Sequence, residues 1–407
     1  MSVHVVVLGD HPIRLWGLST RERVERVLRG SGAAAPSTDF ASLPDDGSVL
    51  LLRGDYLYDN RVLQALLERE GVVLAAEDAA NTPVAAHVPR PLAELARDVL
   101  LGDAPPDSLP ELAREFPSTI SSGYQARLRK VDAPFVYPVT NSNRRFLEGE
   151  LFSGSYKGVT DLVTKWVWPR PARAATHFCV KHGLSPNHVT LASLVLVLLA
   201  TFFFARGLYG PGLLAAWVMT FLDTVDGKLA RVTVTSTTFG HLFDHAIDLL
   251  SPPIWYVVWG RALPSFTAGI PGLSVEVILW GVVGGYVIGR LVEGIFTQFL
   301  GRFGVFSWRP LDSFFRLITA RRNPNLILLT LAAAVGRPDL GLVAVALWTV
   351  STSLFLVWRL ALGGYLRLTS GPLHPWFEDI GGDVAQDSLA VRWFTRRQPA
   401  LTTVADE

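Results

Sequence analysis

The stretch FLDTVDGKLARVTVTSTTFGHLFDHAIDLL, residues 221–250, places four aspartates in sequence that is otherwise apolar enough for a bilayer. Asp223 and Asp226 are three residues apart, and Asp244 and Asp248 are four apart. Each pair therefore shares one face if the flanking segments are helical. Buried carboxylates are tolerated when they are paired or bind metal, and too few basic residues lie nearby to pair with all four. The stretch predicts a divalent cation site, and all-oxygen ligation favours Mg2+ or Mn2+ over zinc.

The residues between the aspartates are equally specific. Together they read D-x2-D-G-x2-A-R-x8-G-x3-D-x3-D from Asp223 to Asp248. This pattern resembles, at every fixed position, the signature of the CDP-alcohol phosphotransferases, which are integral membrane enzymes of phospholipid synthesis. The resemblance implies a transferase that moves a substituted phosphate group from a CDP-alcohol to an acceptor hydroxyl and releases CMP. It also implies Mg2+ or Mn2+ as the cofactor, in a two-metal site.

The resemblance assigns roles to individual residues of the pattern. Asp223, Asp226 and Asp244 would hold the metal ions, while Asp248 would complete the ligand shell or act as the catalytic base that takes the acceptor's proton. Small residues would leave room for the cytidine, and an arginine would offer a planar fork to the phosphates. The implied nucleotide-binding residues are Gly227, Ala230, Arg231, Gly240, Asn187 and Thr190.

Composition narrows the remaining possibilities. The net charge is +1, but basic residues outnumber acidic ones only in residues 151–407, as expected if that half lies against anionic lipid and handles phosphates. Cys179 is the single cysteine, so no disulfide can form within the chain. The N-terminus lacks the basic region, long apolar run and cleavage site of a signal peptide. We therefore expect the first part of the chain to be cytoplasmic, and we expect no nucleic-acid partner.

Residues 1–145 have the pattern of an α/β domain, because short apolar runs alternate with helical patterns. The runs are 3–8, 49–52 and 72–76, and the helical patterns are 20–28, 61–70 and 91–101. This alternation predicts a parallel sheet covered on both faces.

The same domain resembles the sugar-phosphate nucleotidyltransferase module of bifunctional enzymes that make CDP-inositol and then use it. The sequence LGDHPIRLWGLSTRER stands where that module has a Gly-rich, Arg-containing phosphate loop, and the later Pro-Lys pair is missing. A nucleoside triphosphate needs backbone N–H groups and cations around its phosphates. We expect a degenerate domain with a structural or regulatory role. The alternative is nucleotide binding through Arg14, Arg21 and Asp55.

Residues 150–184 join the two halves and are predicted to form an amphipathic interfacial segment. Trp166 and Trp168 interleave with Lys165 and Arg170, a mixture typical of a helix in the membrane interface. A plain cytosolic linker helix is the alternative. The order of Lys157, Asp161, Arg170 and Pro171 is also similar to the start of the inositol-phosphate-transferring branch of the family, which implies an acceptor-binding role for Lys157 and Asp161.

Residues 185–368 are predicted to form an all-α polytopic membrane domain with six transmembrane helices. The apolar runs are 189–204, 213–222, 243–259, 275–299, 326–335 and 342–362. The fifth run is shorter than the roughly 20 residues of a span, so it needs a tilt, a kink or an extension back through 314–320. Six spans place both termini in the cytosol, and residues 369–407 would be a cytosolic tail.

Charged residues near the fourth and fifth runs have two interpretations each. Arg321 and Arg322 either bind a phosphate or an anionic headgroup, or only set the topology. Arg290 and Glu293 are expected to pair, either to ease membrane insertion or to line the acceptor site.

The sequence leaves the substrates open. One option is CDP-diacylglycerol with an alcohol or alcohol phosphate as the acceptor. The other is CDP-inositol with a phosphorylated or lipid acceptor, as in the synthesis of a soluble di-inositol-phosphate type of phosphodiester, and the nucleotidyltransferase-like half favours inositol-phosphate chemistry. A membrane transporter and a catalytically inactive scaffold are the non-enzymatic alternatives. The family resemblance also implies a homodimer in the cytoplasmic (inner) membrane.

Overall fold

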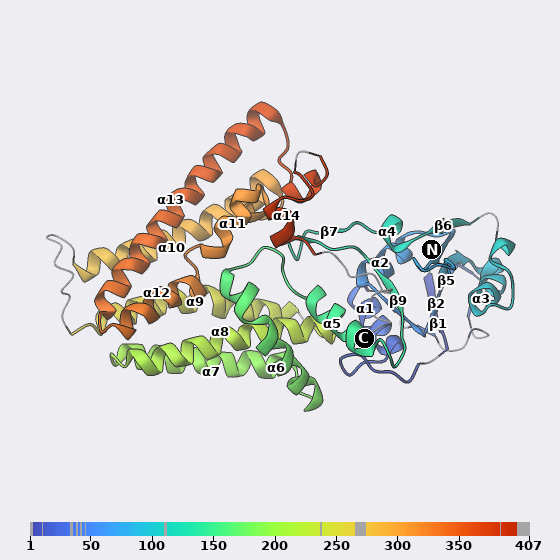
Figure 1. Cartoon of the computed structure of the whole chain (residues 1–407), viewed down its shortest axis with the longest axis horizontal. Helices are drawn as coiled ribbons and strands as arrows, with labels where there is room; N and C mark the ends of the chain where they lie inside the picture. The colour runs from blue at the N-terminus through green and yellow to red at the C-terminus, as the bar shows by residue number, and fades with distance from the viewer. Residues whose placement is uncertain are drawn as a thin grey trace.

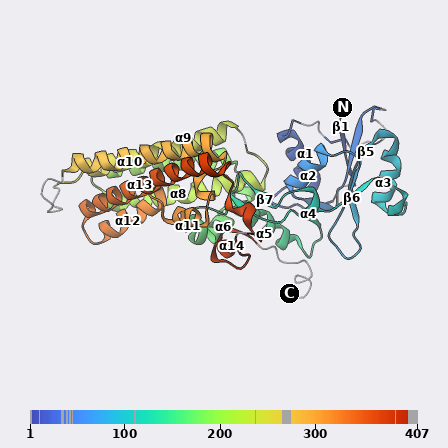
Figure 2. The same ribbon diagram turned by 90° about the horizontal axis from the view of Figure 1, so that it is seen from above.

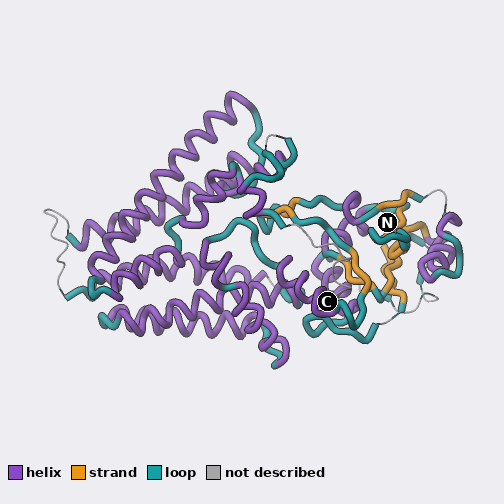
Figure 3. Tube along the Cα trace, in the orientation of Figure 1, coloured by secondary structure: helices purple, strands orange, loops and turns teal. Residues whose placement is uncertain are grey.

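The computed structural model describes residues 3–396 except 10, 33–35, 38–39, 41–42, 45, 110–111, 237, 265–273 and 383, and it does not describe the side chains of 238, 239 and 241. The main strands gather in one half of the molecule and the long helices in the other (Figure 3). The α/β region and the helical region lie end to end (Figure 1). The predicted combination of a mixed α/β N-terminal region with a helical region is confirmed at this level.

Five strands form the main sheet in the order β1-β2-β5-β4-β6. They are β1 (Val3–Leu8), β2 (Ser48–Arg53), β4 (Val72–Ala75), β5 (Pro83–Pro89) and β6 (Ala113–Glu115). The prediction of a parallel sheet is wrong, because β5 runs antiparallel to both β2 and β4. The chain turns back directly after β4, where the Ala76 amide donates to the Thr82 carbonyl at 2.8 Å. A connection this short cannot make the crossover that parallel neighbours require.

Helices cover both faces of this sheet. They are α1 (Thr20–Gly30), α2 (Asn60–Glu68) and α3 (Ala93–Leu101), close to the three predicted helical patterns. On β1, Val5 and Val7 pack in the core with α1 and α2, whereas Val6 between them packs with α3. Figures 1 and 2 show α1 and α2 on the face turned toward the helical bundle and α3 on the opposite face.

Small elements connect the sheet to the bundle. They are β3 (Tyr56–Tyr58), α4 (Pro117–Ile120), β7 (Tyr124–Gln125), β8 (Lys130–Val131), β9 (Val136–Pro138), α5 (Arg144–Gly154) and α6 (Pro169–Lys181). β3 pairs with β9, and β7 pairs with β8 in a short hairpin. Trp166 and Phe178, before and on α6, are 53% and 56% exposed, which agrees with the predicted interfacial segment without testing its place in a membrane.

The helical region contains α7 (Pro186–Ala205), α8 (Tyr209–Val232), α9 (Thr238–Arg261), α10 (Val275–Ile295), α11 (Pro310–Ile318), α12 (Arg322–Ala334) and α13 (Pro338–Ser370). Three helical stretches of the described chain are long and apolar enough to cross a membrane: Pro186–Ala205, Val275–Gly301 and Pro338–Ser370. These candidate spans indicate a multi-pass membrane protein.

The other three predicted spans stay predictions. Helices α8 and α9 have 24 residues each but carry the acidic motif, and α12 has only 13 residues. The fifth apolar run does not extend backwards as one helix, because α11 ends at Ile318 and α12 begins at Arg322.

The described part of the expected C-terminal tail folds back onto the bundle. It contains a short helical turn (Trp376–Asp379) and α14 (Leu389–Phe394). The side chains of Trp376 and Phe394 are each 1% exposed, and the Trp376 indole donates to Ser313 Oγ at 2.9 Å. Trp376, Phe377 and Phe394 therefore belong to the core between the connecting elements and the helices, while much of the rest of the segment is exposed.

The α/β domain contacts the bundle through α1. Arg23 is 3% exposed, and its guanidinium donates to the Val232 carbonyl at 2.6 Å. Arg26 donates to the Thr233 carbonyl at 2.7 Å. These carbonyls lie at the C-terminal end of α8, where unpaired C=O groups and the helix dipole favour cations. The N-terminal domain thus caps the helix that carries the first half of the acidic motif.

Candidate active site

Two consecutive helices bring acids of the motif together. Helix α8 ends at Val232 and α9 begins at Thr238, so the acids near the end of one helix return close to those near the start of the next. One carboxylate oxygen from each of Asp223, Asp226 and Asp244 lies within 4.8 Å of the others. Carboxylate oxygens are the ligands that hard divalent ions prefer. These three residues can therefore hold a metal ion.

Asp226 is buried, and only one of its two carboxylate oxygens accepts a hydrogen bond from a described residue. The Thr190 hydroxyl donates to Asp226 Oδ2 at 2.8 Å. Asp226 Oδ1 is buried and has no hydrogen-bond partner among the described residues. A buried carboxylate oxygen without a partner is costly, so this atom fits a cation ligand. Thr190, predicted to contact the nucleotide, thus orients a carboxylate of the metal-binding group.

Arg322 links the two halves of the motif. Its guanidinium pairs with Asp223 at 2.5 Å and with Asp248 at 2.5 Å. Asp248 is not part of the three-carboxylate group, and its Oδ1 accepts the hydrogen bond from Arg322. Arg322 was predicted to meet a phosphate or set the topology, and in the structure it holds Asp248 beside the metal-binding group.

The residues expected to contact the nucleotide surround the end of α8. A Cβ at Gly227 would lie 3.0 Å from Arg231 Nη2, so the glycine makes room for that guanidinium. Ala230 and Gly240 are half-buried, and Asn187 is exposed at the start of α7. The nucleotide-binding role of these residues stays a prediction.

Several cationic side chains interact electrostatically with one another, and two of them, Lys157 and Arg231, also interact with aspartates of the motif. We call Arg129, Lys157, Arg231, Arg316 and Arg321 the cationic cluster. Part of Lys157 is exposed to solvent. Protein packed around its amino group and the charges of Arg129, Arg231 and Arg316 nevertheless lower its pKa to about 8. Buried guanidinium nitrogens of Arg231, Arg316 and Arg321 have no hydrogen-bond partner in the described part of the chain. Adjacent cations with unpaired donors fit an anionic ligand.

Glu293 partly neutralises this cluster. It pairs with Arg290, which confirms the predicted pair on α10, and also with Arg321. One carboxylate is therefore shared between two arginines. Glu293 forms no ion pair with Lys157 or Arg316, and neither of these residues has another carboxylate partner among the described side chains.

The acceptor-binding role of Asp161 stays a prediction, and the contacts that the structure shows for it are with neighbouring protein groups. It is buried and accepts hydrogen bonds from the amides of Val163 at 3.1 Å and Thr164 at 3.0 Å. It also accepts from Asn323 Nδ2 at 3.0 Å. These contacts, and the charge of Arg316, outweigh the burial that by itself would raise its pKa, so the pKa of Asp161 is lowered. Its contacts tie the connecting segment to α12.

Sequence reasoning identified neither Arg129 nor Arg316. Arg316 could have been found from the repeated arginines between α10 and α12. Arg129 lies in the run RLRK at 127–130, whose charges give no local signal of a site because their partners are far away in sequence.

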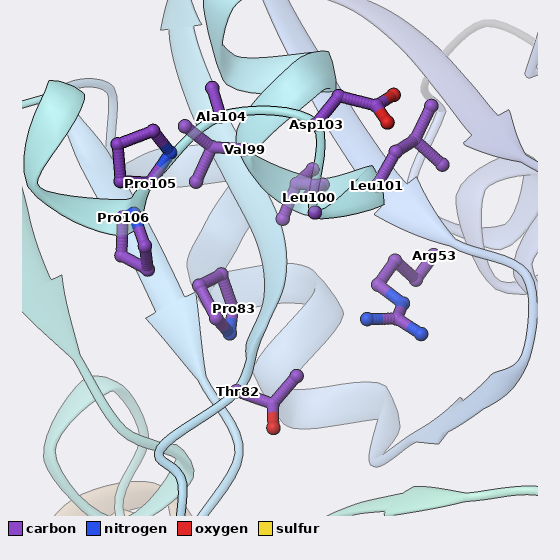
Figure 4. Close-up of a pocket in the computed structure, with 11 residues that line it drawn as sticks. Arg53, Thr82, Pro83, Val99, Leu100, Leu101, Asp103, Ala104, Pro105 and Pro106 are labelled. Atoms are coloured by element: carbon purple, nitrogen blue, oxygen red, sulfur yellow. The ribbon is translucent and has the colours of Figure 1, made fainter.

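The α/β domain has a cavity of about 350 Å3 at the ends of β2 and β5. Figure 4 shows Arg53, Thr82 and Pro83 facing residues of the segment 99–106 across it. Arg53 is the only basic side chain of the described lining, and it pairs with Asp55 at 2.7 Å. Arg14, also proposed for nucleotide binding, pairs with Glu22 at 3.0 Å. The cavity therefore lacks the several cations expected around a triphosphate.

Comparison with known proteins agrees with the site geometry. Residues 184–293 match the sequence profile described as CDP-alcohol phosphatidyltransferase. The chain is 39% identical over 70 residues to an archaetidylinositol phosphate synthase of Pyrococcus horikoshii, covering 17% of this chain and 37% of the relative. It is 35% identical over 94 residues to an uncharacterized protein of Aquifex aeolicus, covering 22% and 46%.

A third relative, an uncharacterized CDP-alcohol phosphatidyltransferase class-I family protein 3 of Dictyostelium discoideum, is 35% identical over 88 residues, covering 18% of this chain and 22% of the relative. The chain thus spans less than half the length of the curated relatives it matches. The match includes α7 to α9 and all four motif aspartates. Residues 184–293 of this chain are therefore a CDP-alcohol phosphatidyltransferase domain, the domain of an enzyme family.

Proposed function

We propose that this protein transfers a substituted phosphate group from a CDP-alcohol to the hydroxyl of an anionic alcohol, with release of CMP. The observation that carries the proposal is the convergence of Asp223, Asp226 and Asp244, whose ligand oxygens lie within 4.8 Å of one another. A divalent cation bound there, Mg2+ or Mn2+, would neutralise the diphosphate of the donor. The free Oδ1 of Asp226 supports this use of the site.

The chain's own residues would carry out the remaining steps. Arg231, with room made by Gly227, would bind donor phosphate, while Ala230 and Gly240 would leave space for the cytidine. Asp248 would take the proton from the acceptor hydroxyl. The acceptor oxygen would then bond to the phosphorus that carries the alcohol, the bond from that phosphorus to the CMP oxygen would break, and CMP would leave with the electron pair.

The cationic cluster supports an acceptor with a phosphate of its own. Buried nitrogens of Arg316 and Arg321 lack partners within the described residues, and Lys157 lies within electrostatic reach of both Arg316 and Asp223. A phosphate monoester would satisfy these donors through charge-assisted hydrogen bonds. Inositol phosphate is the acceptor class that we favour, since a similar protein is named archaetidylinositol phosphate synthase. CDP-diacylglycerol and CDP-inositol are the two donors to compare.

We infer a structural or regulatory role for the α/β domain. Its cap on α8 through Arg23 and Arg26 supports that role, and so do the existing partners of Arg14 and Asp55. We also propose that both termini lie on the cytosolic side of the inner membrane, where soluble substrates reach the motif.

The test is CMP release by the purified full chain in lipid nanodiscs. Each CDP-alcohol would be combined with myo-inositol, myo-inositol 1-phosphate, glycerol and glycerol 3-phosphate, with Mg2+ or Mn2+ present. We expect metal-dependent CMP release with one donor and a phosphorylated acceptor, and none from the Asp223→Asn variant. The absence of CMP with every pair would contradict the proposed transfer.

The α/β domain is tested with the same preparation. Incubation of the full chain with CTP and myo-inositol 1-phosphate should yield no CDP-inositol. Formation of CDP-inositol would show that the domain is an active cytidylyltransferase and would overturn our inference about its role.

A further inference from the structure

Two members of the cationic cluster, Arg129 and Lys157, come from the connecting segments and not from the helical bundle. Arg129 is the last residue of the turn between β7 and β8, in the chain that connects the α/β domain to the bundle. Its backbone φ is +50°, in the left-handed region that side chains other than glycine and asparagine rarely adopt. This conformation is unfavourable for arginine, so the side chain is kept at a cost in stability.

Backbone contacts fix Arg129 beside Lys157. The amide of Val159 donates to the Arg129 carbonyl at 3.2 Å, and the amide of Gly158 donates to the Leu128 carbonyl at 2.9 Å. A Cβ at Gly158 would lie 2.6 Å from the Arg129 carbonyl oxygen, so only glycine permits this approach. Arg129 and Lys157 are thus held in two chain segments whose backbones are hydrogen-bonded to each other.

The Arg129 side chain points to the bundle. A Cβ at Gly304, between α10 and α11, would lie 3.4 Å from Arg129 Cζ, so the guanidinium rests on that glycine. The charges of Arg321 and Glu293 act on it. Glu293 already pairs with Arg290 and Arg321.

The guanidinium of Arg129 itself makes no hydrogen bond or ion pair with any residue in the described ranges. Its fork of five donors is therefore open to a ligand. A cation placed among other cations, in an unfavourable backbone conformation and without an acid of its own, is a poor element of stability. An anionic ligand gives this arrangement a physical purpose.

We propose that Arg129 is a specificity-determining residue for the acceptor, and that it binds the acceptor's phosphate monoester from outside the membrane domain. The inference rests on the proposed transfer reaction. It means that the connecting hairpin completes the acceptor site, which the 184–293 domain alone does not contain. The donor's diphosphate is the other source of phosphate chemistry, so the test must separate donor from acceptor binding.

The test replaces Arg129 with asparagine, which removes the charge but tolerates the left-handed backbone. We expect KM for the phosphorylated acceptor to rise about tenfold to a hundredfold, the range for losing a hydrogen bond to a charged group. KM for the CDP-alcohol should stay within about twofold, and the melting temperature should not fall. Arg129→Lys should give an intermediate KM, because it keeps the charge but loses the fork.

The matched control is Arg145→Met, since Arg145 is an exposed arginine on α5 that forms no ion pair within the described chain. It should leave both KM values unchanged. An unchanged acceptor KM in Arg129→Asn, with active wild-type protein, would overturn this inference and leave the transfer reaction standing. A rise in donor KM alone would also overturn it, by assigning the residue to the diphosphate. Wild-type transfer only to unphosphorylated alcohols would refute the phosphate site, and no CMP from any pair would refute both proposals.

Discussion

Replacing Thr190 with valine tests whether this buried hydroxyl orients a metal ligand. The hydroxyl donates to Asp226 Oδ2 at 2.8 Å, and the two side chains come from different helices. Valine has nearly the same shape, so the change opens no cavity, but it removes the contacts of the hydroxyl with Asp226 and with the Pro186 carbonyl, 3.1 Å away. A hydrogen bond to a charged group contributes about 1.5–3 kcal/mol. Removing it should weaken divalent cation binding by about tenfold to a hundredfold.

The assay is titration of the purified protein with Mn2+, followed by electron paramagnetic resonance, so it does not depend on turnover. The control is Thr220→Val, because Thr220 is equally buried on α8 but donates to the Trp217 carbonyl at 3.0 Å. An unchanged Mn2+ affinity in Thr190→Val would refute the role of this hydroxyl. A rise only in KM for the CDP-alcohol would instead support the direct nucleotide contact that the sequence implied.

Three further predictions concern Asp248, Lys157 and Arg359. Asp248→Asn should abolish CMP release while Mn2+ binding persists, whereas Asp223→Asn should lose both; turnover by Asp248→Asn would exclude it as the base. Because the pKa of Lys157 is lowered to about 8, its charge is present below that pH and lost above it, so KM for a phosphorylated acceptor should rise above pH 8 and Lys157→Arg should remove the rise. Arg359→Met should lower the free energy of unfolding by about 3–5 kcal/mol, because it leaves the buried carboxylate of Asp312, 2.6 Å away, without its partner. The measurement is the melting temperature in detergent. A smaller loss of stability in Arg359→Met than in the double variant Arg359→Met/Asp312→Asn, which has no unpaired charge, would contradict this.

Local sequence patterns were enough to predict the elements that have a continuous apolar run. The apolar runs at 3–8, 49–52 and 72–76 became β1, β2 and β4, since a buried strand needs only a short run of apolar residues. The acids of the motif were also accessible to sequence reasoning. Asp223, Asp226 and Asp244 lie on two helices joined by a short turn, so spacing along the chain nearly fixes their separation in space.

The tertiary structure decided the features that depend on distant contacts. β5 pairs antiparallel in the middle of the sheet because the turn at Ala76 to Thr82 reverses the chain. Arg322 reaches Asp223 and Asp248 from a helix that begins far along the chain.

The sequence by itself determined the family of residues 184–293 and the acidic residues of the motif, because the residue types of the motif and their spacing are local properties. Only the folded chain decided which cations face those acids. Arg129 approaches Lys157 through the β7–β8 hairpin, and Trp376 returns from the C-terminal segment to pack against α11. Such contacts depend on how whole elements pack. The residues next to a charged side chain or an indole in the sequence do not indicate which distant residues that side chain will contact.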